Sequence, residues 1–157
     1  MDIREKFQWA QKALSFYDYE QAEKFAWEIR ESQPELPAVY LLLGNIYTNT
    51  DRYQEAINSY LQAIELDDKN VEAFNNLGIA YRKQENLKAA LEVFAKAHKL
   101  APDRADITYN YANCIKQMGK PEKAEKLYQH AIKQNPGFLM AYNNLGNLYH
   151  HQGRTQE

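Results

Sequence analysis

The sequence predicts an all-α fold of stacked helical hairpins, and three observations lead to this prediction. The chain of 157 residues is 45% hydrophobic and 25% charged, with only six Gly and five Pro, which is typical of a folded protein with few irregular segments. Helix-forming residues dominate over β-branched residues. Small, aromatic and proline positions recur along the chain with a period of 34 residues.

The repeat is clearest at the small residues. Gly44, Gly78 and Gly146 each follow a leucine, and their separations are 34 and twice 34 residues. Further series with the same period are formed by Ala22, Ala56, Ala90 and Ala124, by Pro34, Pro102 and Pro136, and by Tyr47, Tyr81, Ile115 and Tyr149.

Each copy is expected to hold two helices. In the third copy, Phe74, Leu77, Gly78 and Tyr81 have the spacing of one helix face, and the segment 88–100 repeats that spacing. Pro121 falls where the first turn of a helix is expected, and its missing N–H costs nothing there. In chain order, the predicted helices are 3–16, 20–32, 38–50, 54–66, 72–84, 88–100, 106–118, 121–134 and 139–152.

This pattern resembles the tetratricopeptide repeat, which has a large residue, then Leu-Gly and Tyr, then alanines around an aromatic residue, and a closing Pro. The copies span 3–36, 37–70, 71–104, 105–138 and, in part, 139–157, so we expect a single domain over residues 1–157. Lys6 and Thr108 depart from the aromatic position. The resemblance implies a right-handed α-solenoid of four repeats plus one further first helix, because one hairpin cannot bury its own apolar face.

The resemblance also implies that the first helices line a concave groove that binds an extended peptide or a helix of a partner. Asparagines recur at the groove positions, although asparagine is a mediocre helix former. A side-chain amide offers one acceptor and two donors, which match the polar groups of a peptide backbone. This resembles the asparagine ladder in the repeats of O-linked N-acetylglucosamine transferases. The alternative is that the asparagines bond neighbouring helices. The candidate asparagines are Asn45, Asn75, Asn76, Asn110, Asn113, Asn143, Asn144 and Asn147.

Other groove positions suggest a preference among partners. Leu41 makes the early part apolar, Tyr109 lies further along, and Arg82, Lys83 and Lys116 make the middle basic. Such a groove would fit an apolar segment followed by acidic residues. Alternatively, the basic residues are solvated helix ends.

Binding of a chaperone C-terminus is not expected. In the co-chaperone repeats that this pattern resembles, a clamp of lysines, asparagines and an arginine binds the C-terminal carboxylate of a heat-shock chaperone. Asn45 and Asn76 match two of its places, but Leu41, Asp106 and Asn110 stand where cations are needed.

No catalytic or metal-binding pattern is found, so the chain is not expected to be an enzyme or to need a cofactor. It has no phosphate-binding Gly-rich loop, no Gly-x-Ser-x-Gly and no His-Glu-x-x-His sequence. Cys114 is expected to be a small core residue. His150 and His151 are adjacent, so their side chains diverge on a helix and cannot easily share a metal.

Composition excludes several classes of protein. A formal charge of −2 argues against binding to duplex nucleic acid. No apolar run approaches the ~20 residues of a membrane-spanning helix. The charged start, residues 1–6, leads into no apolar segment, so no secretory signal is expected. One cysteine fits a reducing compartment, and we therefore expect a cytoplasmic location.

Two alternatives remain open. The predicted helix 139–152 carries apolar Leu145, Leu148 and Tyr149, whereas the outer side of a terminal helix should be polar. Copies of the chain could therefore associate into a structural scaffold through this helix or through the first repeat. The chain could instead be the recognition part of a larger enzyme, since it resembles transferase repeats.

In the first copy, one of Phe25 and Trp27 is expected to pack inward and the other to mark a contact surface.

Overall fold

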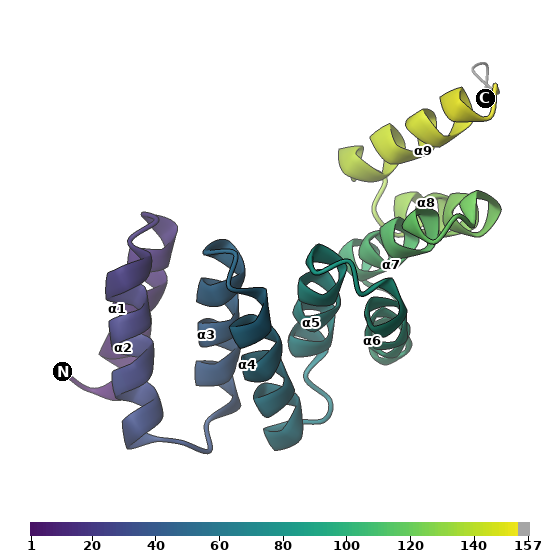
Figure 1. Cartoon of the computed structure of the whole chain (residues 1–157). Coiled ribbons are helices and arrows are strands. Elements are labelled where there is room, and N and C mark those ends of the chain that lie inside the picture. The colour runs from purple at the N-terminus through teal and green to yellow at the C-terminus, as the bar shows by residue number, and fades with distance from the viewer. Residues whose placement is uncertain (154–157) are drawn as a thin grey trace. The chain divides into compact units, whose positions relative to one another are not determined.

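The computed structural model describes residues 1–153, and this part of the chain contains nine α-helices joined by short turns (Figure 1). Every predicted helix is confirmed, with ends that differ from the prediction by at most one residue. The helices are α1 (Ile3–Ser15), α2 (Tyr19–Ser32), α3 (Pro37–Asn49), α4 (Tyr53–Leu66), α5 (Val71–Lys83), α6 (Leu87–Leu100), α7 (Ala105–Gln117), α8 (Pro121–Gln134) and α9 (Leu139–His151).

The helices form two compact units. Unit 1 spans residues 1–84 and holds α1–α5, and unit 2 begins at Glu85 and holds α6–α9. The predicted single-domain organisation stays a prediction. Each unit is described by itself below.

Side chains and prolines fix the starts of several helices. Asp2 and Glu5 form a reciprocal capping box at the start of α1, in which each carboxylate accepts from the other residue's backbone N–H at 2.8 Å. Asn70 caps α5 by accepting from Ala73 N at 3.0 Å. Pro121 opens α8 as predicted.

The turn that follows the first helix of each copy has one left-handed residue. These residues have φ between 58° and 73° and are spaced by 34 positions, so the repeat is present in the backbone as well as in the side chains. Only the last two are glycines, for which this conformation carries no steric cost. The series is Tyr17, Asp51, Glu85, Gly119 and Gly153.

The core of unit 1 is centred on α3, which packs against α2, α4 and α5. Because α3 has neighbours on several sides, more of its residues are buried than in any other helix of the unit. Val39, Leu43 and Ile46 are almost completely buried. Alanines of α2 and α4, among them Ala22 and Ala56, are fully buried and let the helices approach closely.

The core of unit 2 is a smaller cluster in which α7, α8 and α9 meet. Its buried members are Ala112, Ile115, Ala124, Tyr128 and Leu148. Leu148 is therefore a core residue of α9, and the structure corrects the expectation that it lies on a free surface. Leu145 and Tyr149 are partly buried against the same cluster.

Position 44 of α3 requires a glycine because α4 approaches α3 closely at this point. A Cβ at this position would lie 2.6 Å from Tyr60 Cδ1. Tyr60 is 1% exposed, and its hydroxyl is hydrogen-bonded to two side chains of α3, so the ring cannot move away without losing those bonds. Gly146 of α9, at the corresponding position, is exposed, and among the described residues no atom lies within 4 Å of the place that a Cβ would take.

Replacing Gly44 by Ala is predicted to lower the free energy of unfolding by roughly 1–3 kcal/mol, because the added methyl group overpacks the contact with Tyr60. Replacing Gly146 by Ala is the matched control and should raise stability by up to about 1 kcal/mol, since alanine is the better helix former. Urea unfolding followed by circular dichroism measures both. Equal stabilities of the two variants would contradict the close packing of Gly44.

Candidate functional site

A network of two asparagines and a tyrosine connects three helices of unit 1. Asn45 lies on α3, and its Oδ1 accepts from the hydroxyl of Tyr60 on α4 at 2.9 Å and from Nδ2 of Asn76 on α5 at 2.9 Å. The Tyr60 hydroxyl also lies 3.0 Å from Thr48 Oγ1. Burial raises the pKa of Tyr60 to about 12, so its hydroxyl stays protonated at neutral pH and remains a donor.

These bonds fix the orientation of the Asn45 amide. A carbonyl oxygen has two lone pairs, and both are used by Tyr60 and Asn76. The two N–H groups of Asn45 are the part of the amide that remains available. Asn45 also lines a small hollow of about 120 Å³, together with Thr48, Asn49, Tyr60, Asn76 and Ile79.

Unit 2 contains the same network, displaced by 68 residues along the sequence. Oδ1 of Asn113 on α7 accepts from the Tyr128 hydroxyl of α8 at 2.6 Å and from Asn144 Nδ2 of α9 at 2.8 Å. Asn144 Nδ2 also donates to the hydroxyl of Tyr109 at 2.9 Å, and Leu41 holds the corresponding place in unit 1. The asparagines thus bond neighbouring helices in both units, which was the alternative reading of their spacing.

Sequence reasoning missed the two tyrosines, although the sequence held a signal. Tyr60 accompanies Asn45 and Tyr128 accompanies Asn113, whereas the copy between them pairs Ile79 with Phe94. In these three copies, the tyrosine and the asparagine are therefore both present or both absent.

The remaining candidate residues differ in how they are placed. Asn75 is 5% exposed, and its Nδ2 donates to Asn76 Oδ1 at 3.3 Å, so it is a poorly accessible contact residue. Asn143, Asn147 and Lys83 are exposed, and Leu41, Arg82, Tyr109, Asn110 and Lys116 are half-buried.

Cys114 is fully buried, and its thiol donates to the carbonyl of Leu87 at 3.6 Å, which agrees with a core role. Within residues 1–153, no group of three or more His, Cys, Asp and Glu side chains is placed to hold a metal ion. No helix of the described part combines the length and the apolar character that a membrane crossing requires.

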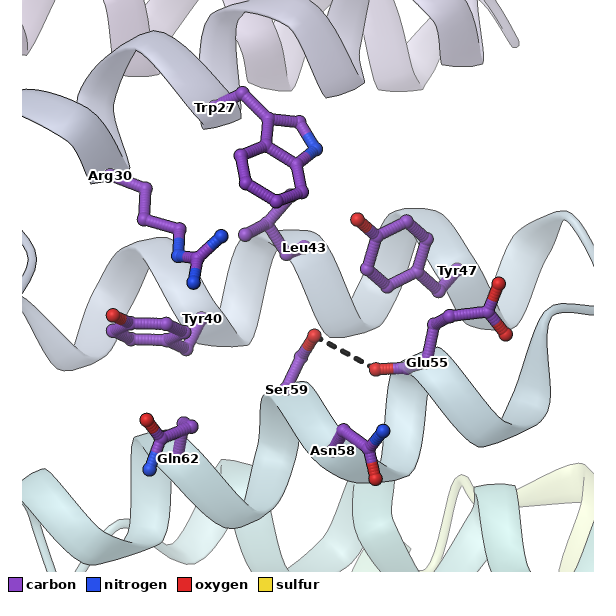
Figure 2. A pocket seen from close by; sticks show the side chains of 9 residues that line it. All are labelled: Trp27, Arg30, Tyr40, Leu43, Tyr47, Glu55, Asn58, Ser59 and Gln62. Carbon is purple, nitrogen blue, oxygen red and sulfur yellow. Dashed lines mark hydrogen bonds between the residues drawn. The ribbon is translucent and has the colours of Figure 1, made fainter.

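A second surface in unit 1 was only partly anticipated. Trp27 of α2 is 41% exposed and Phe25 is half-buried, so Trp27 is the more exposed residue of the pair but Phe25 is not a core residue. The structure adds that Trp27 borders a cleft between α2, α3 and α4, together with Arg30 and the aromatic residues Tyr40 and Tyr47 (Figure 2).

Raising the pH is predicted to weaken unit 1 through Tyr60. Its pKa in the folded state is about 12, against an ordinary value of 10.0, so its contribution is complete below pH 10 and is lost as the pH rises toward 12. Two pKa units correspond to roughly 2–3 kcal/mol. The Tyr60→Phe variant should start about 1–3 kcal/mol less stable, because Asn45 loses a donor, and should then lose less on alkalinisation than the unsubstituted protein.

Urea unfolding at about pH 8 and about pH 11.5 measures this difference, and all other side chains are common to both proteins. Tyr17→Phe is the control, because Tyr17 is 77% exposed, and it should lose as much stability as the unsubstituted protein. Equal losses in all three proteins would show that Tyr60 does not couple to pH.

Three family models match the chain. The description "TPR repeat" applies to residues 44–85, and the description "Tetratricopeptide repeat" applies to residues 81–138 and again to residues 127–157. Together they cover residues 44–157 without a gap.

Two curated relatives and one solved structure illustrate the similarity. Tetratricopeptide repeat protein 21B of Mus musculus is 32% identical over 69% of this chain. The UDP-N-acetylglucosamine–peptide N-acetylglucosaminyltransferase of Giardia intestinalis is 32% identical over 76%. In each case the match spans only 8% of the relative's length. The crystal structure of MamA superposes with a TM-score of 0.83 at 27% identity, covering 99% of this chain and 87% of MamA.

Proposed function

The chain belongs to the tetratricopeptide-repeat family, whose repeats form protein–protein interaction scaffolds, and we propose that it holds an extended segment of a partner protein against its first helices. The proposal is for a non-catalytic binding module in the cytoplasm. It concerns the first-helix face of each unit, meaning α1, α3 and α5 in unit 1 and α7 and α9 in unit 2.

The orientation of the Asn45 amide is the observation that carries this proposal. Its oxygen accepts two hydrogen bonds inside the protein, and Asn45 lines a hollow at the protein surface, so its N–H groups are the donors left for a ligand there. An unpaired amide N–H is a good donor for the carbonyl groups of an extended peptide, which are present in every sequence. Asn113 is held in the same way in unit 2. Each unit therefore offers one pre-oriented donor that needs no rearrangement on binding.

Neighbouring residues would add preference for particular partners. Leu41 and Tyr109 occupy corresponding places beside Asn45 and Asn113, and they offer an apolar surface in one unit and an aromatic hydroxyl in the other. Arg82 and Lys83 in unit 1 and Lys116 in unit 2 favour acidic residues in the partner. The exposed amides of Asn143 and Asn147 extend the polar surface of α9.

Replacing Asn45 by Asp is predicted to weaken peptide binding about tenfold or more while leaving the fold intact. Aspartate keeps an oxygen for Tyr60 and Asn76 but loses the outward N–H groups and adds a charge that repels peptide carbonyls. Peptides selected from a displayed random library on the unsubstituted protein serve as probes, and fluorescence anisotropy gives their affinities.

Asn70→Asp is the matched control, because it adds the same charge in the same unit and retains the cap of α5. Its affinity should match that of the unsubstituted protein. A library that yields no binder, or an Asn45→Asp variant that binds as tightly as Asn70→Asp, would rule out the proposed role of the amide.

A second candidate function is self-association through α9. Leu139, Met140 and Tyr142 are 72%, 55% and 46% exposed, so this helix presents a larger apolar surface than Leu145, Leu148 and Tyr149 provide. We predict that, if the protein oligomerises, Leu139→Glu converts it to a monomer. Light scattering after size exclusion over a range of concentrations measures this, and a monomeric unsubstituted protein would exclude this function.

The similarity to the Giardia transferase supports a third reading, in which these repeats are the recognition part of a larger enzyme. The binding surface proposed above would serve such an enzyme unchanged, since selection of an extended substrate segment is also a binding function.

A further inference from the structure

Unit 1 contains a cleft of about 210 Å³ on the side of α3 that faces α2 and α4 (Figure 2). Tyr40, Leu43 and Tyr47 of α3 form its floor, Trp27 and Arg30 of α2 form one wall, and the opposite wall comes from α4. The volume lies below the ~300–1,000 Å³ of typical small-molecule sites. It suits one side chain with its adjoining backbone.

The guanidinium of Arg30 is held in place by aromatic rings and not by a carboxylate. Its Cζ lies 4.5 Å from the ring centroid of Trp27 and 5.8 Å from that of Tyr40, so the aromatic rings fix its position. No carboxylate of the part of the chain that the structure describes forms an ion pair with it. Its donors are therefore available at the cleft.

Arg52, near the other end of the cleft, shows the contrast. It stacks on Tyr47 with its Cζ 4.3 Å from the ring centroid, but it also forms ion pairs with Glu23 at 2.8 Å and with Glu55 at 3.1 Å. Two carboxylates thus surround one cation at that end, while Arg30 has none. The cleft is positive at the Arg30 end and neutral to negative at the Arg52 end.

We propose that this cleft is a second peptide-binding site, which takes an apolar side chain against Leu43 and the rings of its floor and an adjacent aspartate or glutamate on Arg30. The apolar floor supplies the burial, and the guanidinium supplies charge-assisted hydrogen bonds to the carboxylate. Stacking keeps the guanidinium in place before binding, so little side-chain entropy is lost when the acid arrives.

The α4 wall can hold the backbone of the bound segment. Asn58 Oδ1 accepts from Gln54 Nε2 at 3.2 Å, which leaves the Asn58 amide N–H groups for a peptide carbonyl. The Ser59 hydroxyl is satisfied by the carbonyl of Glu55 at 2.9 Å (Figure 2), so it places no unpaired donor in the cleft.

The cleft is separate from the first-helix face. On α3, Leu43 and Tyr47 of the cleft and Asn45 of the hollow point to different sides, because positions two apart on a helix diverge by about 160–200°. A partner seated on Asn45 would leave Arg30 free, so the protein could hold two segments at once.

The test uses Trp27 as a reporter in the Trp9→Phe variant, which leaves Trp27 as the sole tryptophan. Synthetic peptides of Gly and Ser, each with one glutamate beside one leucine in varied spacing and order, are titrated into the full chain. We expect saturable changes in Trp27 emission for at least one spacing. The same peptide with glutamine in place of glutamate should bind about tenfold more weakly.

Arg30→Gln should cause the same loss, and Arg30→Lys should restore only part of the affinity, because lysine keeps the charge but not the stacked planar group. Arg4→Gln on α1 removes the same charge elsewhere in unit 1 and should bind normally. Asn45→Asp should also bind these peptides normally. A loss of binding at the cleft can therefore be distinguished from a loss of binding at the first-helix face. Thermal unfolding checks that each variant is folded.

Three outcomes would overturn the proposal. No peptide gives a saturable change at millimolar concentration, or the glutamate and glutamine peptides bind equally, or Arg4→Gln weakens binding as much as Arg30→Gln. Trp27 emission that depends on protein concentration alone, with an increase in mass by light scattering, would identify a second copy of the chain as the occupant instead.

Discussion

The buried tyrosine of the second helix is the contact on which much of unit 1 depends. Tyr60 lies directly over Gly44 of α3, and its hydroxyl reaches Asn45 and Thr48 on the same helix. The ring therefore sets the distance between α3 and α4, and the hydroxyl sets the orientation of the Asn45 amide. Packing and binding chemistry are coupled through one side chain, because a phenol is both a large apolar group and a hydrogen-bond donor.

Unit 2 uses the same arrangement with small differences that change its surface. Tyr128 is buried in a cluster with Ala112 and donates to Asn113. Tyr109 gives Asn144 a second acceptor, which occupies more of the amide donors than in unit 1. Two units of the same design can thus present different numbers of free donors, and this is a simple way for a repeat protein to vary its partners without altering its fold.

The arginines that contact aromatic rings in unit 1 illustrate how charge is distributed on a helical surface. Arg52 and Arg30 both stack on tyrosine rings of α3, yet only Arg52 is neutralised by carboxylates. Stacking confines a guanidinium without satisfying its hydrogen bonds, whereas an ion pair does both. Hence Arg30 of α2 and Arg52, the N-cap residue of α4, differ in what they can offer to a partner.

The sequence by itself determined the helices and the repeat. Periodic small and apolar residues specify helical faces locally, and helix ends follow from caps, prolines and turns within a few residues, so the predicted bounds agree with the structure to one residue. It also identified Asn45, Asn76, Asn113 and Asn144 as unusual. Only the tertiary structure decided what these asparagines do, because the bonds to Tyr60 and Tyr128 join residues on different helices. The same reason explains Leu148 and Arg30: burial and pairing depend on which helices become neighbours, and a residue's own segment does not contain that information.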